Sequence, residues 1–416
     1  MKNIKRKSYL SLWKEQSQEK EMVFLAGPRQ AGKTTLTKEI AQNFKNNFYF
    51  NWDILSNKKI LIKNPTFFEN INRIDNSKPF IIFDEIHKYK NWKNYLKGIY
   101  DEFFQEYLFL ISGSGRLDTY QKGGDSLAGR YLMFHLFPFT ISELSAKKRL
   151  FSNFIKDPIS NFQINNLATT RKNWKKLFEL SGFPEPFAKN KKTFWTKWTK
   201  NYTNQIIRED IRDISNIKNV NNVEILFSLL PSKVGSPISV NNLANDIQIA
   251  NKTAQDWLNL FDTTYLTFKL SPWTKKISRA ITKEKKIYLF NYPIIQEEGE
   301  RFENMVAVEL YRIIHYWNES GYGNFKLHYI RNKEKEEVDF AISNNNAPIM
   351  LIETKNSDTK ISKSLINFQN ILNIPAIQLV NKQNIYRIQK NNDNKILVAT
   401  ADQWLSSLPE NANTKK

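Results

Sequence analysis

Residues 22–36 read MVFLAGPRQAGKTTL, and this stretch decides how the N-terminal part of the chain folds. Its apolar beginning, Met22–Ala26, predicts a buried parallel strand, and Thr35–Phe44 predicts the helix that follows. The residues between them fit the pattern G-x-x-x-x-G-K-[ST], which predicts a phosphate-binding loop. The residues expected to bind the phosphates are Gly27, Pro28, Arg29, Gln30, Ala31, Gly32, Lys33, Thr34 and Thr35.

The chemistry of phosphate binding explains these residue types at this spacing. Gly27 and Gly32 allow the backbone to curl so that successive N–H groups point at phosphate oxygens. The N-terminus of the following helix adds a partial positive charge beneath the same phosphates. Lys33 is expected to reach the β- and γ-phosphates as a catalytic cation, and the Thr34 hydroxyl to ligate Mg²⁺.

A second segment, Phe80–Glu85, reads FIIFDE and predicts a buried strand that ends in two carboxylates. Ligands of an open parallel sheet bind at the carboxyl ends of its strands, so Asp84 is expected beside the loop. There it would hold Mg²⁺ directly or through another ligand of the ion, and Glu85 would orient and activate a water for attack on the γ-phosphate. No guanine-reading N-K-x-D tetrapeptide is present, which favours ATP over GTP.

Two further segments carry candidate residues for the same site. The apolar run Tyr107–Ile111 predicts a strand that ends in Ser-Gly-Ser-Gly, where Ser112 or Ser114 would sense the γ-phosphate; a simple glycine turn is the alternative. Arg130 precedes another apolar stretch and is a candidate for phosphate contact or for an arginine finger acting in trans. A solvated surface arginine is the alternative interpretation of Arg130.

Length and composition exclude several classes of protein. The 416 residues predict two to four domains, since domains typically have roughly 100–200 residues. The absence of cysteine excludes a disulfide framework, cysteine-ligated zinc and cysteine nucleophiles. No apolar run approaches the roughly 18 residues of a membrane helix, and the basic N-terminus lacks the apolar core of a secretory signal. These features predict a soluble cytoplasmic protein without a membrane partner.

The formal charge of +21 lies entirely in the first two thirds of the chain. Residues 1–150 hold 25 Lys+Arg against 15 Asp+Glu, residues 151–290 hold 22 against 11, and residues 291–416 hold 15 against 15. A basic field favours anionic partners such as nucleic acid. The chain is also rich in Lys and Asn throughout, so compositional drift explains the same excess, and charge alone does not decide between them.

The middle of the chain predicts helices and a helix-turn-helix. Residues 150–230 alternate aromatic residues with lysine at helical spacing; Trp195 and Trp198 favour a core-facing stripe over a nucleic-acid surface. Ile238–Phe261 then predicts two short helices with Ser239 as an N-cap, and the strands Tyr265–Leu270 and Lys285–Phe290 would supply a wing. Such a winged helix docks either DNA or another protein.

The last group of candidate residues is Glu303, Asp339, Glu353 and Lys355. Glu303 lies early in a predicted helix, and Asp339 and Glu353 lie on two predicted strands, with Lys355 on the same strand face as Glu353. Asp followed by Glu-x-Lys is the pattern of PD-(D/E)xK nuclease-like folds, in which paired carboxylates hold Mg²⁺ against the scissile phosphate. A structural ion-pair cluster is the alternative, and the balanced charge of this region is poor for gripping DNA.

These segments together resemble the prokaryotic AAA-type ATPases that carry a C-terminal domain of unknown function 4143. The similarity is carried by GPRQAGKTTL, IIFDEIHKYKNWKNYLKGIYD, ISGSG and LAGRYLMFHLFPFTISEL, and it continues through SGFPE, the Arg-Glu-Asp of the helix near Tyr202 and the YLFN strand near Tyr288. It covers nearly the whole chain in the expected order. One departure is Asn291-Tyr292-Pro293, where the family usually has Asp-Thr-Gly, and no acid is available there.

The predicted fold is α/β: a P-loop ATPase with a parallel sheet, a helical and winged-helix middle, and an α/β restriction-endonuclease-like C-terminal domain. The expected domains are 1–148 (ATPase), 149–230 (helical connector), 231–290 (winged helix), 291–405 (nuclease-like) and 406–416 (polar tail). We expect Mg²⁺-dependent ATP hydrolysis that drives a conformational switch, coupled to DNA binding or processing. The alternative is a nucleotide-switched DNA- or protein-binding regulator with a silent nuclease-like domain, acting as a homo-oligomer or with a protein partner.

Overall fold

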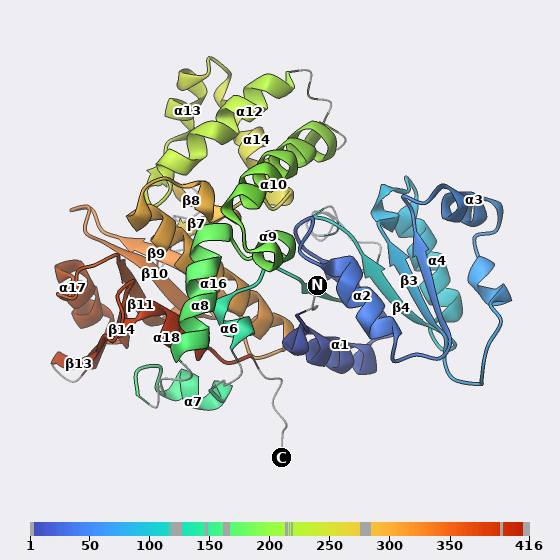
Figure 1. Ribbon diagram of the computed structural model, residues 1–416, viewed down its shortest axis with the longest axis horizontal. Coiled ribbons are helices and arrows are strands. Elements are labelled where there is room, and N and C mark those ends of the chain that lie inside the picture. Colours follow the sequence, from blue (N-terminus) through green and yellow to red (C-terminus); the bar gives the residue numbers. More distant parts are fainter. Residues whose placement is uncertain are drawn as a thin grey trace. The chain divides into compact units, whose positions relative to one another are not determined.

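The structure is a computed structural model that describes residues 4–115, 117, 127–145, 149–160, 167–212, 215, 217, 219–274, 284–391 and 394–410 (Figure 1). It divides into two compact units, which are described separately below. Unit 1 comprises residues 1–138 with 263–265, and unit 2 comprises residues 139–262 with 266–416. The predicted α/β class is confirmed, since unit 1 is built on a parallel sheet and unit 2 on a separate mixed sheet.

Unit 1 contains a five-stranded sheet in the order β2-β3-β4-β1-β5, and every pairing in it is parallel. Its strands are β1 Met22–Ala26, β2 Asn47–Asn51, β3 Phe80–Asp84, β4 Leu108–Ser112 and β5 Leu132–His135. The buried apolar runs that predicted β1 and β3 form these strands without interruption, because both faces of the sheet are covered. β4 lies between β1 and β3, so its end lies between the two segments expected to form a site.

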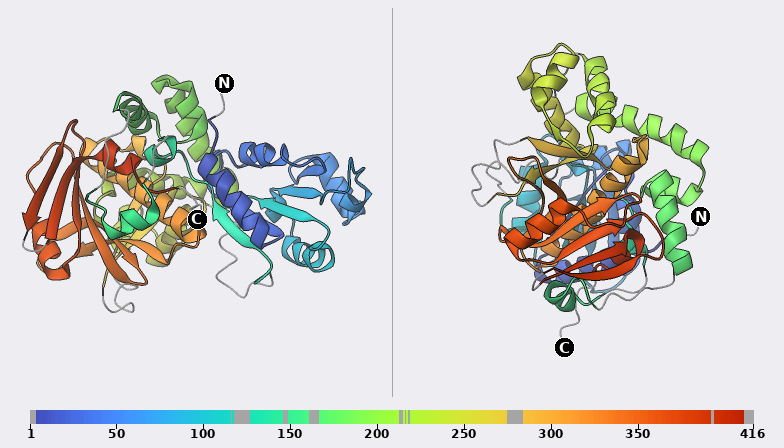
Figure 2. Two further views of the ribbon diagram at one scale, coloured as in Figure 1. Left: turned by 90° about the horizontal axis from the view of Figure 1, so that it is seen from below. Right: turned by 90° about the vertical axis from the view of Figure 1, so that its left-hand side faces the viewer.

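Helices cover the two faces of this sheet. They are α1 Lys7–Glu19, α2 Lys33–Ala41, α3 Leu55–Lys63 and α4 Trp92–Phe103. On one face Trp13 of α1 packs on Phe80, and Figure 2 shows α1 lying along the strands. On the other, Trp92 of α4 packs against Phe24. The predicted helix Thr35–Phe44 is confirmed as α2, which starts two residues earlier, directly after Gly32.

Unit 2 contains a mixed sheet of nine strands in the order β13-β14-β12-β11-β10-β9-β7-β8-β6. Its strands are β6 Pro237–Ile238, β7 Thr267–Pro272, β8 Lys285–Leu289, β9 Phe325–Arg331, β10 Glu337–Asn344, β11 Ala347–Lys355, β12 Ala376–Val380, β13 Tyr386–Asn391 and β14 Asn394–Thr400. β7 pairs with both β8 and β9. The segments expected as winged-helix and nuclease-like domains therefore share one sheet.

The helices of unit 2 confirm the two expectations for the middle of the chain. They are α6 Ile141–Leu144, α7 Phe151–Lys156, α8 Leu167–Leu180, α9 Pro184–Lys189, α10 Lys192–Gln205, α12 Val220–Leu229, α13 Val240–Asp246, α14 Asn251–Thr263, α16 Glu298–Glu319, α17 Lys363–Leu372 and α18 Ala401–Ser406. The Ser239 hydroxyl accepts a hydrogen bond from the Asn242 N–H, which makes it the N-cap of α13. Trp195 and Trp198 of α10 are buried, as the core interpretation requires. In the right-hand view of Figure 2, α12, α13 and α14 form one end of this unit.

The last described residues belong to the folded part of unit 2, although the sequence suggested a polar tail from residue 406. Glu410 is 1% exposed, and its carboxylate forms an ion pair with Arg312 of α16, which is 0% exposed. The carbonyl oxygens of Pro409 and Glu410 accept hydrogen bonds from Trp317 and Tyr316 of the same helix. This hydrophilic segment is thus buried with α16 as the partner of the Glu410 carboxylate and of the last two carbonyl oxygens.

The Arg312–Glu410 pair predicts a large and specific loss of stability. Replacing Arg312 by Ala leaves the Glu410 carboxylate buried without its main counter-charge, which costs about 3–5 kcal/mol of unfolding free energy. The matched control is Arg208→Ala, because Arg208 pairs with Glu224 at the surface and is 59% exposed in its side chain; exposed pairs contribute about 0–1 kcal/mol. Urea unfolding of the full chain measures both, and equal losses in the two variants would contradict the assignment.

Candidate functional site

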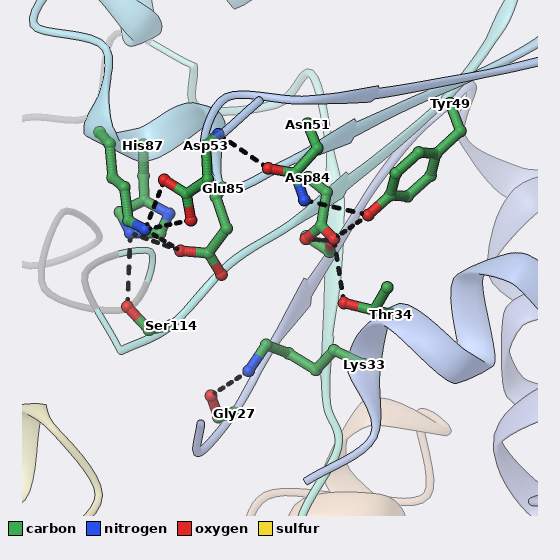
Figure 3. Close-up of polar contacts among 12 residues, drawn as sticks. Gly27, Lys33, Thr34, Tyr49, Asn51, Asp53, Asp84, Glu85, His87 and Ser114 are labelled. Atoms are coloured by element: carbon green, nitrogen blue, oxygen red, sulfur yellow. Dashed lines mark hydrogen bonds and ion pairs between the residues drawn. The ribbon is translucent and has the colours of Figure 1, made fainter. Parts of the chain in front are cut away.

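Three strand ends meet at the carboxyl edge of the parallel sheet of unit 1. The register aligns Leu25 of β1 with Ser112 of β4, and Ser112 with Asp84 of β3. The loop that follows β1 therefore lies on one side of the end of β4, and the end of β3 lies on the other. Figure 3 shows Thr34 of this loop beside Asp84. Parallel pairing thus brings together two segments that sequence analysis identified separately.

The loop has the backbone that its sequence predicts. Gly27 and Gly32 have φ values of 135° and 98°, in the region that favours glycine. The Lys33 ammonium curls back over the loop, donating to the carbonyl oxygens of Gly27 at 2.9 Å and Pro28 at 2.7 Å. It is therefore held over the concave side of the loop, where its charge is available to an anion.

Asp84 is buried and accepts hydrogen bonds from three hydroxyl groups. Thr34 donates to Oδ2 at 3.0 Å, Tyr49 donates to the same oxygen, and Ser112 donates to Oδ1. Burial, and then the hydrogen bond to the Asp84 carboxylate, raise the pKa of Tyr49 well above its usual value. Because the Thr34 proton is used toward Asp84, the lone pairs of its oxygen remain for a metal ion, and Mg²⁺ prefers oxygen ligands of this kind.

Glu85 extends from the end of β3 in a left-handed conformation, with φ of 57°. Its N–H donates to the Ser112 carbonyl at 2.9 Å, which fixes this turn against β4. Its carboxylate lies 3.2 Å from the Lys88 ammonium, which also contacts Asp53 at 2.6 Å. Burial lowers the pKa of Lys88, but the two carboxylates outweigh it and raise the pKa overall. Glu85 is thus held by a cation at the edge of the site.

The two serines after β4 have different partners. Ser112 is fully buried against Asp84, whereas the Ser114 hydroxyl lies 3.3 Å from Nε2 of His87. The same His87 nitrogen is 3.7 Å from the Glu85 carboxylate. Ser112 therefore contacts the Asp84 carboxylate directly, whereas Ser114 is connected to the Glu85 carboxylate through His87.

Sequence analysis missed three residues of this site: Arg6, Tyr49 and His87. The Arg6 guanidinium is buried and donates to the carbonyl oxygens of Ala31, within the loop, and Phe137. Arg6 stands in a basic N-terminal segment that resembles a surface segment, and Tyr49 stands in a short segment without a recognised motif. His87 lies within IIFDEIHKYK, which carries the family resemblance but gives this histidine no role. Contacts between segments distant in sequence bring the three residues to the site, so the local sequence does not predict their position.

Arg130 is the one predicted site residue of unit 1 that lies at the amino ends of the strands. It precedes β5, which runs parallel to β1, so it lies at the amino end of the strands and away from the loop. Its guanidinium makes two hydrogen bonds with Asp101 of α4, at 2.6 and 3.0 Å. Within one chain this position separates Arg130 from Lys33, and a role in trans stays a prediction.

The C-terminal candidates gather on the sheet of unit 2. β10 and β11 are antiparallel with Phe340 opposite Ile352, which places Asp339 beside Glu353 as expected. Asp339 accepts hydrogen bonds from the N–H and hydroxyl of Thr354, and Lys355 contacts Glu353 at 2.7 Å. Among the described residues, the buried Oε2 of Glu353 has no hydrogen-bond partner. Burial, and then the neighbouring Asp339, raise the pKa of Glu353 to about 8.

Glu303 of α16 joins the same cluster through residues of β8. Its carboxylate accepts a hydrogen bond from Tyr288 at 2.7 Å and contacts the Lys286 ammonium at 3.2 Å. Burial, and then Asp339, raise the pKa of Glu303 to about 7. Within the described chain, no three carboxylates of this cluster bring their oxygens within 4.8 Å of one another. At Asn291, where the resembled family has an acid, the side chain instead bonds Trp195 and Thr199 of α10.

Three parts of the chain match known families. Residues 19–145 match the AAA domain family, residues 171–295 match a domain of unknown function numbered 8612, and residues 298–400 match a domain of unknown function numbered 4143. The parallel sheet, the loop and both acids after β3 thus lie within an AAA domain match, which supports a P-loop ATPase. The predicted domain 4143 is present, and its match contains Glu303, Asp339, Glu353 and Lys355.

Full-length comparisons find distant relatives. The chain is 20% identical over 361 residues to an uncharacterized protein of Mycobacterium tuberculosis, covering 83% of this chain and 72% of the relative. It is 25% identical over 305 residues to an uncharacterized protein of Methanocaldococcus jannaschii, covering 67% and 62%. A solved Walker-type ATPase of Pyrococcus abyssi is similar with 12% identity and a TM-score of 0.42, over 70% of this chain and 95% of that chain. None of the described helices is long and apolar enough to cross a membrane.

The loop geometry predicts that Gly27 tolerates no side chain. A Cβ at Gly27 would lie 2.3 Å from the Leu136 carbonyl oxygen, and its φ is positive. Strain of this kind costs about 1–3 kcal/mol, so Gly27→Ala should destabilise unit 1 by at least this amount. In the control Gly98→Ala, no atom within 4 Å opposes the new methyl group, and a helix gains about 0.5–1 kcal/mol. Denaturant unfolding measures both, and a neutral Gly27→Ala would contradict the loop geometry.

Proposed function

We propose that this protein binds and hydrolyses ATP with Mg²⁺ at the carboxyl edge of the parallel sheet, and that the nucleotide state switches its conformation. The observation that carries the proposal is the hydrogen bond between Thr34, at the end of the loop, and Asp84, at the end of β3. It joins the phosphate-binding and metal-binding halves of a nucleotide site in one contact. The AAA domain match over residues 19–145 supports the same reaction class.

The loop residues bind and orient the triphosphate in this proposal. The backbone N–H groups of Arg29–Thr34 and the N-terminus of α2 face the phosphates. The Lys33 ammonium exchanges its two carbonyl acceptors for phosphate oxygens, because a charged acceptor forms the stronger hydrogen bond. Arg6 keeps the loop in place through the Ala31 carbonyl.

Thr34 and Asp84 are the residues that would hold Mg²⁺, which supplies neutralisation of charge on the β- and γ-phosphates when bound. Asp84 keeps its two oxygens oriented through the hydroxyl groups of Thr34, Tyr49 and Ser112. Three fixed donors prevent this carboxylate from turning away, so its charge stays directed at the site. Ser112 links the Asp84 position to β4, and Ser114 links His87 to the same turn.

Glu85 is the proposed base that orients and activates the attacking water. Its carboxylate lies beyond Asp84 at the same strand end and is 20% exposed, so water can reach it. Lys88 lies 3.2 Å from this carboxylate and holds it in place. Arg130 is proposed to act only in trans, from a second copy of the chain, because it lies at the opposite edge of its own sheet.

Two substitutions separate binding from hydrolysis. Lys33→Ala should weaken ATP binding strongly, because it removes the cation over the loop. Glu85→Gln should leave binding unchanged and slow hydrolysis by about 10²–10⁴-fold, the usual contribution of a positioned base. Equilibrium binding of labelled ATP and release of inorganic phosphate measure the two effects.

The control for Lys33→Ala is Lys38→Ala, because Lys38 lies on the exposed side of the same helix. It should bind and hydrolyse ATP like the unsubstituted protein. Hydrolysis at an unchanged rate by Glu85→Gln would show that Glu85 is not the base, and unchanged ATP affinity in Lys33→Ala would remove the nucleotide site itself.

A second candidate function is metal-dependent cleavage of nucleic acid at the cluster of unit 2. The observation that favours it is the buried Oε2 of Glu353, which has no partner among the described residues and lies beside Asp339. A buried carboxylate oxygen without a donor is costly, and a cation relieves that cost. Asp339 and Glu353 are the residues that would hold Mg²⁺, with Lys355 beside them to stabilise charge on the scissile phosphate.

A polar groove on the helix-turn-helix supports nucleic acid as the partner. Its volume is about 580 Å³, and it lies between α13, α14 and the strands β7 and β8. Its polar lining comprises Asn241, Asn251, Gln255, Asn259, Lys269, Glu284 and Lys285, and within it Asn251 donates to Asn241 and Gln255 donates to Asn259. Amides of this kind pair with the edge of adenine, and lysines contact phosphates. Binding of DNA here is compatible with an active or a silent carboxylate cluster.

Supercoiled plasmid DNA with Mn²⁺ discriminates an active from a silent cluster. We expect the full chain to nick the plasmid, and Asp339→Asn to lower the rate by about 10²-fold or more, since metal stabilisation is worth several kcal/mol. Glu300→Gln is the control, because Glu300 lies one turn before Glu303 on α16 and is exposed. Gel electrophoresis measures nicking, and a gel shift at increasing salt measures binding.

The outcomes of this experiment separate the proposals. Binding of the plasmid without nicking would leave the alternative, a nucleotide-switched regulator that docks DNA with a silent cluster. Neither binding nor nicking at low salt would leave a protein partner for the helix-turn-helix and assign the basic excess to composition.

A further inference from the structure

Lys286 of β8 is a buried ammonium group among three carboxylates. Its side chain is 0% exposed, and Nζ lies 2.6 Å from Glu337, 3.2 Å from Glu303 and 4.0 Å from Asp339. Glu337 and Glu303 lie at hydrogen-bond distance from this ammonium, and Asp339 lies at ion-pair distance. The ammonium is therefore enclosed by acids, as a bound cation would be.

The lysine and the acids come from different parts of unit 2. Lys286 lies within the match to the domain numbered 8612, whereas Glu303, Glu337 and Asp339 lie within the match to the domain numbered 4143. β8 places Tyr288 on the same strand face as Lys286, and its hydroxyl donates to Glu303. Residues from both domain matches thus form the cluster. Its buried cation, Lys286, lies outside the segment that carries the D…ExK pattern.

The geometry distinguishes an ammonium from a divalent ion. Divalent ions draw carboxylate oxygens to about 2.0–2.6 Å and so bring their ligands close together. Here no three carboxylates of the cluster bring oxygens within 4.8 Å of one another, and the ammonium contacts each acid at hydrogen-bond or ion-pair distance. The ammonium lies at hydrogen-bond distance from Glu303 and Glu337, and its contact with Asp339 at 4.0 Å is an ion pair without a hydrogen bond.

The two sides of the cluster are therefore unequal. Glu303 and Glu337 have donors in Lys286, with Tyr288 on Glu303 and Arg331 on Glu337. On the other side, Glu353 contacts Lys355, and its buried Oε2 has no hydrogen-bond partner among the described side chains and backbone. Asp339 lies between the two sides, facing Lys286 with Oδ1 and Thr354 with Oδ2.

We propose that Lys286 is a protein-supplied cation that takes the place of one of two metal ions, so that the cluster accepts a divalent ion only at Asp339 and Glu353. Removing the ammonium then opens a second divalent site at Glu303, Glu337 and Asp339. Two-metal sites place their ions about 3.5–4 Å apart to clamp a phosphoryl group. With Lys286 in place, the protein itself supplies the positive charge that a second metal ion would bring. This charge does not depend on the concentration of metal ions.

The test counts Mn²⁺ bound to the full chain without nucleotide, by electron paramagnetic resonance of the free ion. Lys286→Met removes the charge and keeps the length of the side chain. It should bind one Mn²⁺ more per chain than the unsubstituted protein, and the double variant Lys286→Met with Glu303→Gln should lose that additional ion. Lys326→Met is the control, because Lys326 on β9 of the same sheet is exposed; it should bind as many ions as the unsubstituted protein.

Thermal unfolding provides the second measurement. Without metal, Lys286→Met should melt at a lower temperature, and Mn²⁺ should raise its melting temperature by more than it raises that of the unsubstituted protein. An unchanged or lower number of bound ions in Lys286→Met overturns the proposal, and so does a variant that fails to fold even in millimolar Mn²⁺. The difference of one ion is the criterion, so the test does not depend on DNA cleavage or on ATP hydrolysis.

Discussion

The position of β4 between β1 and β3 is the constraint on which the nucleotide site depends. Parallel register fixes the ends of the three strands side by side, with Ser112 next to Asp84. From this arrangement follow the Ser112–Asp84 hydrogen bond, the Glu85 N–H bond to the Ser112 carbonyl, and the contact between Thr34 and Asp84. Backbone pairing, which carries no side-chain chemistry, thus sets the distance between the phosphate loop and the acids.

Sequence predicts those elements whose signal is local. The loop, β1, β3, the Ser239 cap and the two helices after it follow from the order of neighbouring residues, and the structure confirms each of them. The antiparallel pairing of Asp339 with Glu353 is also a local inference, since β10 and β11 are adjacent in sequence. Such elements can be predicted from sequence because each depends on residues within a few positions of one another.

Residues whose partners are distant in sequence remained hidden. Arg6 contacts the carbonyl of Phe137, and Lys286 contacts an acid fifty residues further along the chain, in Glu337. Both stand in lysine-rich segments where a cation is the commonest residue, so composition gives no reason to select them. The same limit explains the C-terminal residues: Glu410 is hydrophilic in sequence and is buried only because Arg312 neutralises it. Tertiary pairing, and not propensity, decides the burial of these charges.

The two carboxylate sites of the chain treat negative charge in opposite ways, and this difference indicates what each can bind. Asp84 is surrounded by neutral hydroxyl groups, which orient its oxygens without cancelling its charge. Such a carboxylate retains its attraction for a cation that arrives and leaves with a nucleotide. The cluster of unit 2 is surrounded by lysines, and Lys286 has already neutralised one side of it. A fixed ammonium cannot leave with a product, so that side of the cluster is permanently compensated. In our proposal, exchange of cations is therefore confined to the side where, among the described residues, the buried Oε2 of Glu353 has no hydrogen-bond partner.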